Sequence, residues 1–200
     1  AGPNRMNRIV VGQAAHAIAH FLLNNRSDYQ DPQGELSVVI GYDGRINSDV
    51  FAKDSAEIFA GAGIKVSLFD SPVPTPVACF TGARLGSSAT IVVTASHNPP
   101  RDNGYKVYLG GPLFGSQLVP PQDKEIASLI SETATNLSFS EIPKAASYAV
   151  LSEPAVQLYR DRALQLVSPE NAARSELRIS YTAMHGVGYR VIDPIFRSLG

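Results

Sequence analysis

The sequence contains a single cysteine, Cys79, among its 200 residues. One cysteine excludes an internal disulfide, and no CxxC pair or Cys/His array is available for zinc. Because stable disulfides belong to oxidising compartments, this scarcity favours a reduced, cytoplasmic location. Long apolar runs are also lacking, since Leu36–Gly41 and Ala89–Val93 are far below the roughly 20 residues of a membrane-spanning helix. We therefore expect no membrane partner.

An excess of charge of one sign is missing as well. The chain has 17 Lys+Arg against 18 Asp+Glu, a formal net charge of −1. This balance argues against a nucleic-acid partner held by bulk charge, although a small local anion site remains compatible with it. With 44% hydrophobic and 18% charged residues, the chain is neither disordered nor a coiled coil. It opens at Ala1 without Met, and we expect it to be part of a longer polypeptide.

Apolar spacing predicts alternating helices and strands in the first three quarters of the chain. The expected helices cover residues 6–24, 48–61, 76–85 and 122–130, with Ser48 as a cap, and the expected strands cover 36–41, 64–69, 89–93 and 105–109. Strand, helix, strand, helix, strand is typical of right-handed parallel crossovers. The last connection is too short for a parallel crossover, so its strand is expected to run antiparallel. We predict a three-layer α/β/α domain with a mixed, mainly parallel sheet of at least four strands.

The remaining residues indicate a second, shorter unit. A polar stretch, Thr133–Ser147, is typical of a linker, which predicts a first domain at residues 1–146 and a second segment at 147–200. In that segment we expect a helix at Pro154–Val167, a strand at Leu177–Tyr181 and a final helix at Tyr189–Leu199. This order is the start of a second α/β domain.

The predicted topology brings polar side chains to one edge of the sheet. The carboxyl ends of parallel strands share that edge, and open α/β sheets bind ligands there. Three loops end at it and the antiparallel strand starts from it. We therefore expect five side chains to converge: Arg45, Thr75, Ser96, His97 and Lys106.

The loop after the third strand offers a serine among cations. Pro99 and Pro100 stiffen this loop, and His97 points away from Ser96 in extended backbone, which makes a Ser-His acyl-transfer pair a poor fit. A hydroxyl among Arg45, His97, Arg101 and Lys106 suits phosphoryl transfer, which depends on positioning and charge stabilisation. The alternative, which spacing alone leaves open, is a polar turn whose serine and histidine only satisfy backbone groups.

The same loop carries a resemblance to a known family. Thr94–Pro99, followed by Asp102–Lys106, resembles the phosphoserine loop of the α-D-phosphohexomutases, the phosphoglucomutases and phosphomannomutases. Gly41–Arg45 resembles their arginine loop and Pro74–Pro76 their Pro-Thr-Pro turn. Tyr181–Gly188 is similar to the first strand and turn of their second domain. The resemblance thus spans domain 1 and the start of domain 2.

The resemblance implies an isomerase that moves phosphate between C1 and C6 of a glucose or mannose phosphate. A phosphoserine gives its phosphoryl group to the sugar, and the resulting sugar bisphosphate, also the activator, reorients and returns the other phosphate. The implied site residues are Ser96, Lys106, Arg45 and His97 for catalysis, and Thr75, Asn98 and Arg101 for substrate. The implied cofactor is Mg²⁺ on Ser96, although the family's Asp-Gly-Asp-x-Asp metal loop is missing from these residues.

Two consequences follow from what is missing. We expect these 200 residues alone to be inactive, because one ligand does not hold Mg²⁺. The alternatives to a hexose phosphate mutase are a phosphopentomutase, a sugar-bisphosphate synthase, or a catalytically silent sugar-phosphate-binding module. Among other candidates, His16 and His20 have metal spacing but are expected at a solvated or interface position, Cys79 is expected to pack, and His185 is expected in a tight turn.

Overall fold

The computed structural model describes residues 5–168, 170, 176 and 178–199. The helices of these residues are α1 (Arg8–Asn24), α2 (Arg26–Tyr29), α3 (Ser48–Gly61), α4 (Thr75–Arg84), α5 (Gln122–Asn136), α6 (Glu153–Leu164) and α8 (Tyr189–Leu199), with a short 3₁₀ turn at Gly111–Leu113. The strands are β1 (Ser37–Tyr42), β2 (Lys65–Phe69), β3 (Ala89–Val93), β4 (Tyr105–Leu109), β5 (Ser116–Gln117) and β6 (Ala149–Leu151).

The strands form one mixed sheet in the order β5-β4-β3-β1-β2-β6. β1 pairs in parallel with both β2 and β3, and β2 pairs in parallel with β6. β4 runs antiparallel to β3, as the short connection predicts. The expected mixed, mainly parallel sheet of at least four strands is therefore confirmed.

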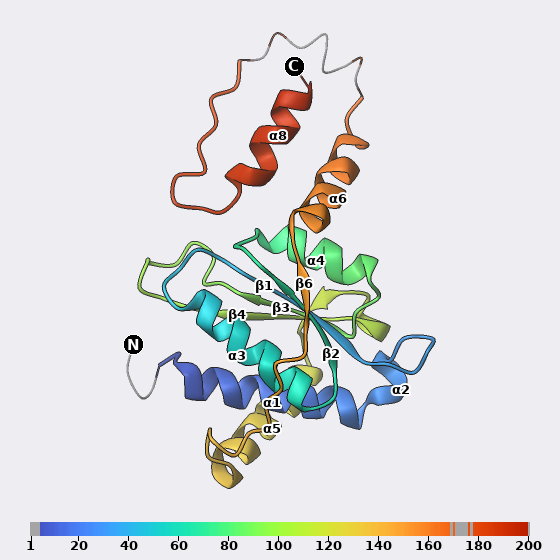
Figure 1. The fold of residues 1–200 in the computed structure, drawn as a ribbon, viewed down its shortest axis with the longest axis vertical. Helices are drawn as coiled ribbons and strands as arrows, with labels where there is room; N and C mark the ends of the chain where they lie inside the picture. Colours follow the sequence, from blue (N-terminus) through green and yellow to red (C-terminus); the bar gives the residue numbers. More distant parts are fainter. Residues whose placement is uncertain (1–4, 169, 171–175, 177, 200) are drawn as a thin grey trace.

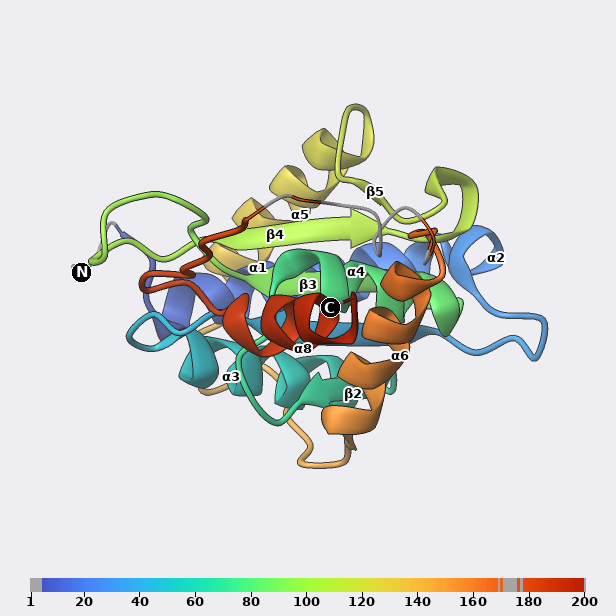
Figure 2. The ribbon, with the colours of Figure 1, turned by 90° about the horizontal axis from the view of Figure 1, so that it is seen from above.

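Helices cover both faces of the sheet, which gives the expected three layers. In Figure 1, α1, α3 and α5 lie on one side of the strands and α4, α6 and α8 on the other. Figure 2 shows the second group lying over the strands. The side chains of β1 alternate between the two layers, with Val38 and Ile40 in one core cluster and Val39 in the other. Both faces are buried, which explains why β1 and β3 are continuous apolar runs.

Helices α1 and α3 are joined by a charged pair. The guanidinium of Arg8, in the first turn of α1, donates from Nε to Oδ2 of Asp54 and from Nη2 to Oδ1, both at 2.7 Å. The Asp54 side chain is 5% exposed, so the carboxylate is buried with its partner at the rim. The side chain of Asn7 caps α1 by accepting from the N–H groups of Ile9 and Val10.

Several predicted elements end elsewhere or have another role. Ser48 does not cap α3, because Asn47 is the cap residue and the Ser48 hydroxyl donates to Asp43 Oδ1 at 2.7 Å. Helix α5 runs to Asn136 rather than ending at Ile130, so it takes up the start of the predicted linker. His16 is buried against α5 rather than solvated, whereas its neighbour His20 is exposed.

The C-terminal segment differs most from the prediction. Residues 178–183 form no strand, and Leu177 lies outside the described residues. The side chains of Ile179 and Tyr181 are 64% and 40% exposed, and no described strand lies beside them to complete a ladder. The division at residues 146 and 147 stays a prediction, and β6, which follows it, belongs to the first sheet. In the part of the chain that the structure describes, no helix has the length and apolarity to cross a membrane.

Candidate functional site

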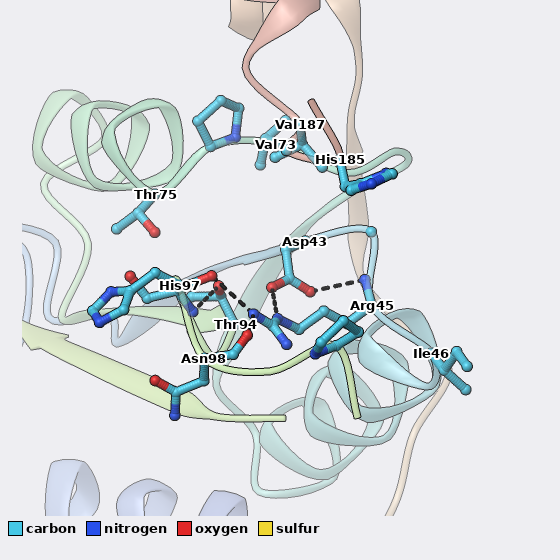
Figure 3. Close-up of a pocket in the computed structure, with 15 residues that line it drawn as sticks. Asp43, Arg45, Ile46, Val73, Thr75, Thr94, His97, Asn98, His185 and Val187 are labelled. Carbon is cyan, nitrogen blue, oxygen red and sulfur yellow. Dashed lines mark hydrogen bonds and ion pairs between the residues drawn. The ribbon is translucent and has the colours of Figure 1, made fainter. Parts of the chain in front are cut away.

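A cavity of about 500 Å³ lies at the carboxyl edge of the parallel strands. The loops after β1, β2 and β3 form most of its wall, as the topology predicts, and the turn before α8 forms the rest (Figure 3). Its lining residues are Asp43, Gly44, Arg45, Ile46, Val73, Pro74, Thr75, Thr94, Ser96, His97, Asn98, Pro100, His185, Gly186 and Val187.

Ser96 occupies an unusual backbone conformation at this wall. Its φ is +56°, in the left-handed region that residues other than glycine rarely adopt. The N–H of Ser96 donates to the hydroxyl of Thr94 at 3.0 Å, and the N–H of Asn98 donates to the carbonyl of Ala95 at 3.0 Å. These bonds close a tight turn that leaves Ser96 exposed at the cavity. Strain of this kind persists where the surrounding structure enforces it.

The serine loop, residues 94–104, closes on itself at its base. The N–H of Thr94 donates to the carbonyl of Gly104 at 3.0 Å. A Cβ at Gly104 would lie 2.4 Å from the Thr94 carbonyl oxygen, far inside contact distance. Glycine is required here because two stretches of backbone touch.

Arg45 crosses from the β1 loop to the serine loop and binds it through backbone carbonyls. Its Nε donates to Asp43 Oδ2 at 3.0 Å. Its four remaining N–H groups donate to carbonyl oxygens of the serine loop: Ser96 at 2.9 Å, Asn98 at 2.8 Å, Pro99 at 2.7 Å and Asp102 at 3.0 Å. All five donors of the guanidinium are therefore used within the protein. The guanidinium therefore has no free N–H for a direct hydrogen bond to a phosphoryl group, and the catalytic role that the resemblance implies for Arg45 stays a prediction.

Asp43 is fixed in turn by its own neighbours, as the dashed lines of Figure 3 partly show. Its Oδ1 accepts from the Ser48 hydroxyl at 2.7 Å and from the Arg45 N–H at 3.1 Å. The amide of Asn103 donates to the Ile46 carbonyl at 2.9 Å, which ties the far end of the serine loop to the same β1 loop. The two loops therefore form one hydrogen-bonded unit.

The structure brings together most, but not all, of the predicted site residues. Thr75, Asn98 and His97 line the cavity with Ser96 and Arg45. Arg101 does not line it. Arg101 faces a separate cavity of about 770 Å³ on another side of the serine loop, which Arg5 also lines.

Lys106 does not line the cavity either, but lies on the same face of the sheet as α4. It pairs with Val92, whose side chain packs in the α4 layer, and paired residues of an antiparallel ladder share a face.

Burial raises the pKa of the Cys79 thiol on α4, while Tyr108 and the nearby ammonium of Lys106 act in the opposite direction. Cys79 packs against the core on this face, as predicted.

His185, Gly186 and Val187 are cavity residues that sequence reasoning did not place there. Val187 Cγ1 would lie 3.5 Å from a Cβ on Gly44, so the turn before α8 reaches the β1 loop. Ion pairs hold the turn, because Glu153 of α6 pairs with both Arg160 and Arg190, and Arg190 donates to the Ser71 hydroxyl at 3.1 Å. The sequence signal was the likeness of Tyr181–Gly188 to a second-domain turn.

The described residues do not fit Mg²⁺ on their own. Among them, no three His, Cys, Asp or Glu side chains gather into a group that could hold a metal ion. Asp43 lines the cavity, but its two oxygens already accept from Arg45 and Ser48. The Ser96 hydroxyl supplies one oxygen ligand, whereas Mg²⁺ needs several. Ser96 as a metal contact stays a prediction.

Comparison with known proteins agrees with this fold. Residues 1–137 match the family model described as phosphoglucomutase/phosphomannomutase, alpha/beta/alpha domain I. A Haemophilus influenzae protein named "Probable phosphomannomutase" is 45% identical over 195 residues, which cover 98% of this chain and 38% of that protein. The phosphoribomutase of Saccharomyces cerevisiae is 32% identical over 212 residues, covering 98% of this chain and 33% of its own.

A solved structure shows the same fold. The phosphoglucomutase/phosphomannomutase family protein from Burkholderia thailandensis superposes with a TM-score of 0.68 at 22% identity, over 99% of this chain and 40% of that one. The chain spans 38% and 33% of the length of the two curated relatives. On the strength of the matched family domain, the chain belongs to the phosphoglucomutase/phosphomannomutase family.

Proposed function

We propose that this chain is the N-terminal part of a phosphosugar mutase in which Ser96 carries the transferred phosphoryl group. The observation that carries the proposal is the placement of Ser96, exposed at the wall of a cavity of about 500 Å³ in a turn that Arg45 of the β1 loop binds. Two relatives that are 45% and 37% identical to it over the aligned residues are named "Probable phosphomannomutase" and "Probable phosphoribomutase". Substrate, mechanism and cofactor are parts of this proposal.

The proposed reaction is a phosphoryl exchange between Ser96 and the sugar. A sugar hydroxyl attacks the phosphorus of phosphorylated Ser96, the new P–O bond forms, and the bond to Ser96 Oγ breaks. The hydroxyl proton passes to a base, for which His97 is the candidate because it lines the same wall. Oγ takes up a proton as its bond to phosphorus breaks; Lys106, to which the resemblance assigns a part in proton transfer, does not line the cavity, so its role stays a prediction. The sugar bisphosphate then reorients, and the reverse step returns the second phosphate to Ser96.

The start of α4 supports binding of a phosphoryl group at this cavity. Pro74 and Thr75, where α4 begins, line the cavity wall opposite the serine loop. The N-terminus of a helix carries partial positive charge, which favours a phosphate beside it. This source of charge is independent of Arg45, whose donors are all used. Thr75 adds a hydroxyl that can donate to a phosphate oxygen.

Hexose phosphate is the proposed substrate class, and pentose phosphate is the second candidate. The 45% identity to the Haemophilus influenzae protein favours the first, and the likeness to the yeast phosphoribomutase favours the second. A sugar-bisphosphate activator, a Mg²⁺ cofactor and a cytoplasmic location stay predictions. So does the inactivity of the 200 residues on their own.

The test is intact-mass analysis and turnover of the full-length protein that contains this chain. After incubation with glucose 1,6-bisphosphate, we expect a phosphoryl adduct that Ser96→Ala removes together with the conversion of glucose 1-phosphate or mannose 1-phosphate. Ser27→Ala is the matched control, since Ser27 is an exposed serine on α2. Ribose 1-phosphate tests the pentose alternative. An adduct that survives in the Ser96→Ala variant would refute the assignment.

A further inference from the structure

The guanidinium of Arg45 is fully engaged by the serine loop. An arginine that recognises a phosphate normally offers two free N–H groups for a bidentate contact. Arg45 has none free, because its Nε–H is bonded to Asp43 and its other four N–H groups are bonded to loop carbonyls. Its side chain is only 13% exposed. Contact with a phosphoryl group would require Arg45 to release part of the loop that presents Ser96.

We infer that Arg45 is a positioning residue for phosphoryl transfer, an inference that rests on the proposed function of Ser96. Arg45 holds the carbonyl of Ser96 itself together with carbonyls three and six residues further on, at Pro99 and Asp102. These contacts keep the backbone of Ser96 in its left-handed conformation, so that its hydroxyl remains at the cavity wall. Arg45 thus acts by fixing where the Ser96 Oγ atom points, and not by placing its charge on the substrate.

Asp43 is the second half of this device, which we call the Asp43–Arg45 clamp. The Asp43 carboxylate accepts from the Nε–H and from the backbone N–H of Arg45, which fixes the position of the guanidinium. The Ser48 hydroxyl, at the first residue of α3, holds the other side of the carboxylate. The clamp therefore connects the serine loop to a helix end of the main core. It predicts that Asp43 and Arg45 work as one unit.

The chemistry of lysine makes Arg45→Lys the informative change. Lysine keeps the positive charge but has three donors on one nitrogen, so it cannot reach four carbonyls and Asp43 at once. A displacement of about 1 Å in a reacting group can lower a rate by roughly a hundredfold. We therefore expect kcat to fall about a hundredfold, while KM for the sugar phosphate stays within about threefold. A residue whose charge binds the substrate would show the opposite division between kcat and KM.

The experiment compares Arg45→Lys, Asp43→Asn and the double variant in the full-length protein. Kinetics are measured together with hydrogen exchange of the Asn98 and Asp102 amides, which close the two turns of the loop. Arg26→Lys is the control, because Arg26 also donates to a backbone carbonyl, that of Gly34, far from the cavity. We expect faster exchange in the loop for both single variants, and a double variant that loses no more kcat than the worse of the two.

The outcomes separate this inference from the proposed function. Retained kcat, a rise in KM alone, or unchanged exchange in the loop would each overturn the clamp. If Arg45→Lys fails to fold, Asp43→Asn decides by the same criteria. If the parent protein without substitutions converts no sugar phosphate and forms no adduct at Ser96, the proposed function fails. Amide exchange alone then decides whether the clamp exists.

Discussion

Replacing Gly104 with alanine measures how closely the serine loop folds back on itself. The new Cβ would lie 2.4 Å from the carbonyl oxygen of Thr94 and 3.1 Å from the Cα of Ala95. Both neighbours are main-chain atoms, so neither can rotate away as the end of a side chain can. The loop must open at its base, next to Ser96.

The expected cost follows from the two contacts involved. Forcing an extra carbon into a packed site costs about 1–3 kcal/mol. Losing the 3.0 Å hydrogen bond from the Thr94 N–H to the Gly104 carbonyl adds about 1 kcal/mol. We therefore expect a loss of roughly 2–4 kcal/mol in the free energy of unfolding. In a chain of this size each kcal/mol lowers Tm by about 2–4 °C, so Tm should fall by roughly 4–16 °C.

The assay is thermal and urea unfolding followed by circular dichroism, with Gly44→Ala as the control. A Cβ at Gly44 meets Val187 Cγ1 at 3.5 Å, which is ordinary contact, so this variant should stay within about 0.5 kcal/mol of the parent. A Gly104→Ala protein that melts within one degree of the parent, taken as the order of experimental error, would refute the close approach. Equal losses in both variants would refute it too.

Two further changes test the layer that contains α1. Asp54→Ala removes both bonds to Arg8 and should lower the free energy of unfolding by about 1.5–3 kcal/mol in urea melts, and an unchanged midpoint would contradict the buried pair. Burial, and secondarily the charge of His20, lowers the pKa of His16, which contacts the Thr133 hydroxyl at 3.2 Å. Burial makes protonation of His16 less favourable in the folded state than in the unfolded state. The free energy of unfolding should therefore be highest above pH 6.5, the ordinary pKa of histidine, and decline as the pH falls below it. Melts from pH 7.5 to 5, chosen to bracket roughly that pKa, should show a shallower decline for His16→Gln.

The main sheet was predictable because its strands are buried on both sides. Continuous apolar runs such as Ala89–Val93 leave little alternative, and the short connection to Tyr105 fixes the direction of β4. Strand β6 was not predictable in this way, because its three residues are largely exposed and become a strand only where the edge of β2 is open. The strand expected at Leu177–Tyr181 was wrong for residues 178–181, because an alternating sequence forms a strand only where a partner strand is available, and no described strand lies beside these residues.

The candidate site was predictable in its location but not in the division of roles. Parallel topology places the loops of Arg45, Thr75 and Ser96 at one edge whatever their detailed conformation. The charge of Arg45 suggested a phosphate contact, yet its donors go to carbonyls more than fifty residues away, which spacing along the chain does not reveal. Ser48 is a similar case, because a residue suited to capping a helix instead bonds a carboxylate in the preceding loop.

The short strand β6 fastens α6 to the main sheet. A single residue, Ser152, separates β6 from α6, and β6 is itself fastened to β2. Moving α6 and α8 away from the sheet would expose Val156 and Val191, which are buried in the same cluster as Val77. The turn with His185 leads directly into α8, whose Val191 is buried against the same layer, so this part of the cavity wall rests on the helices that cover the sheet.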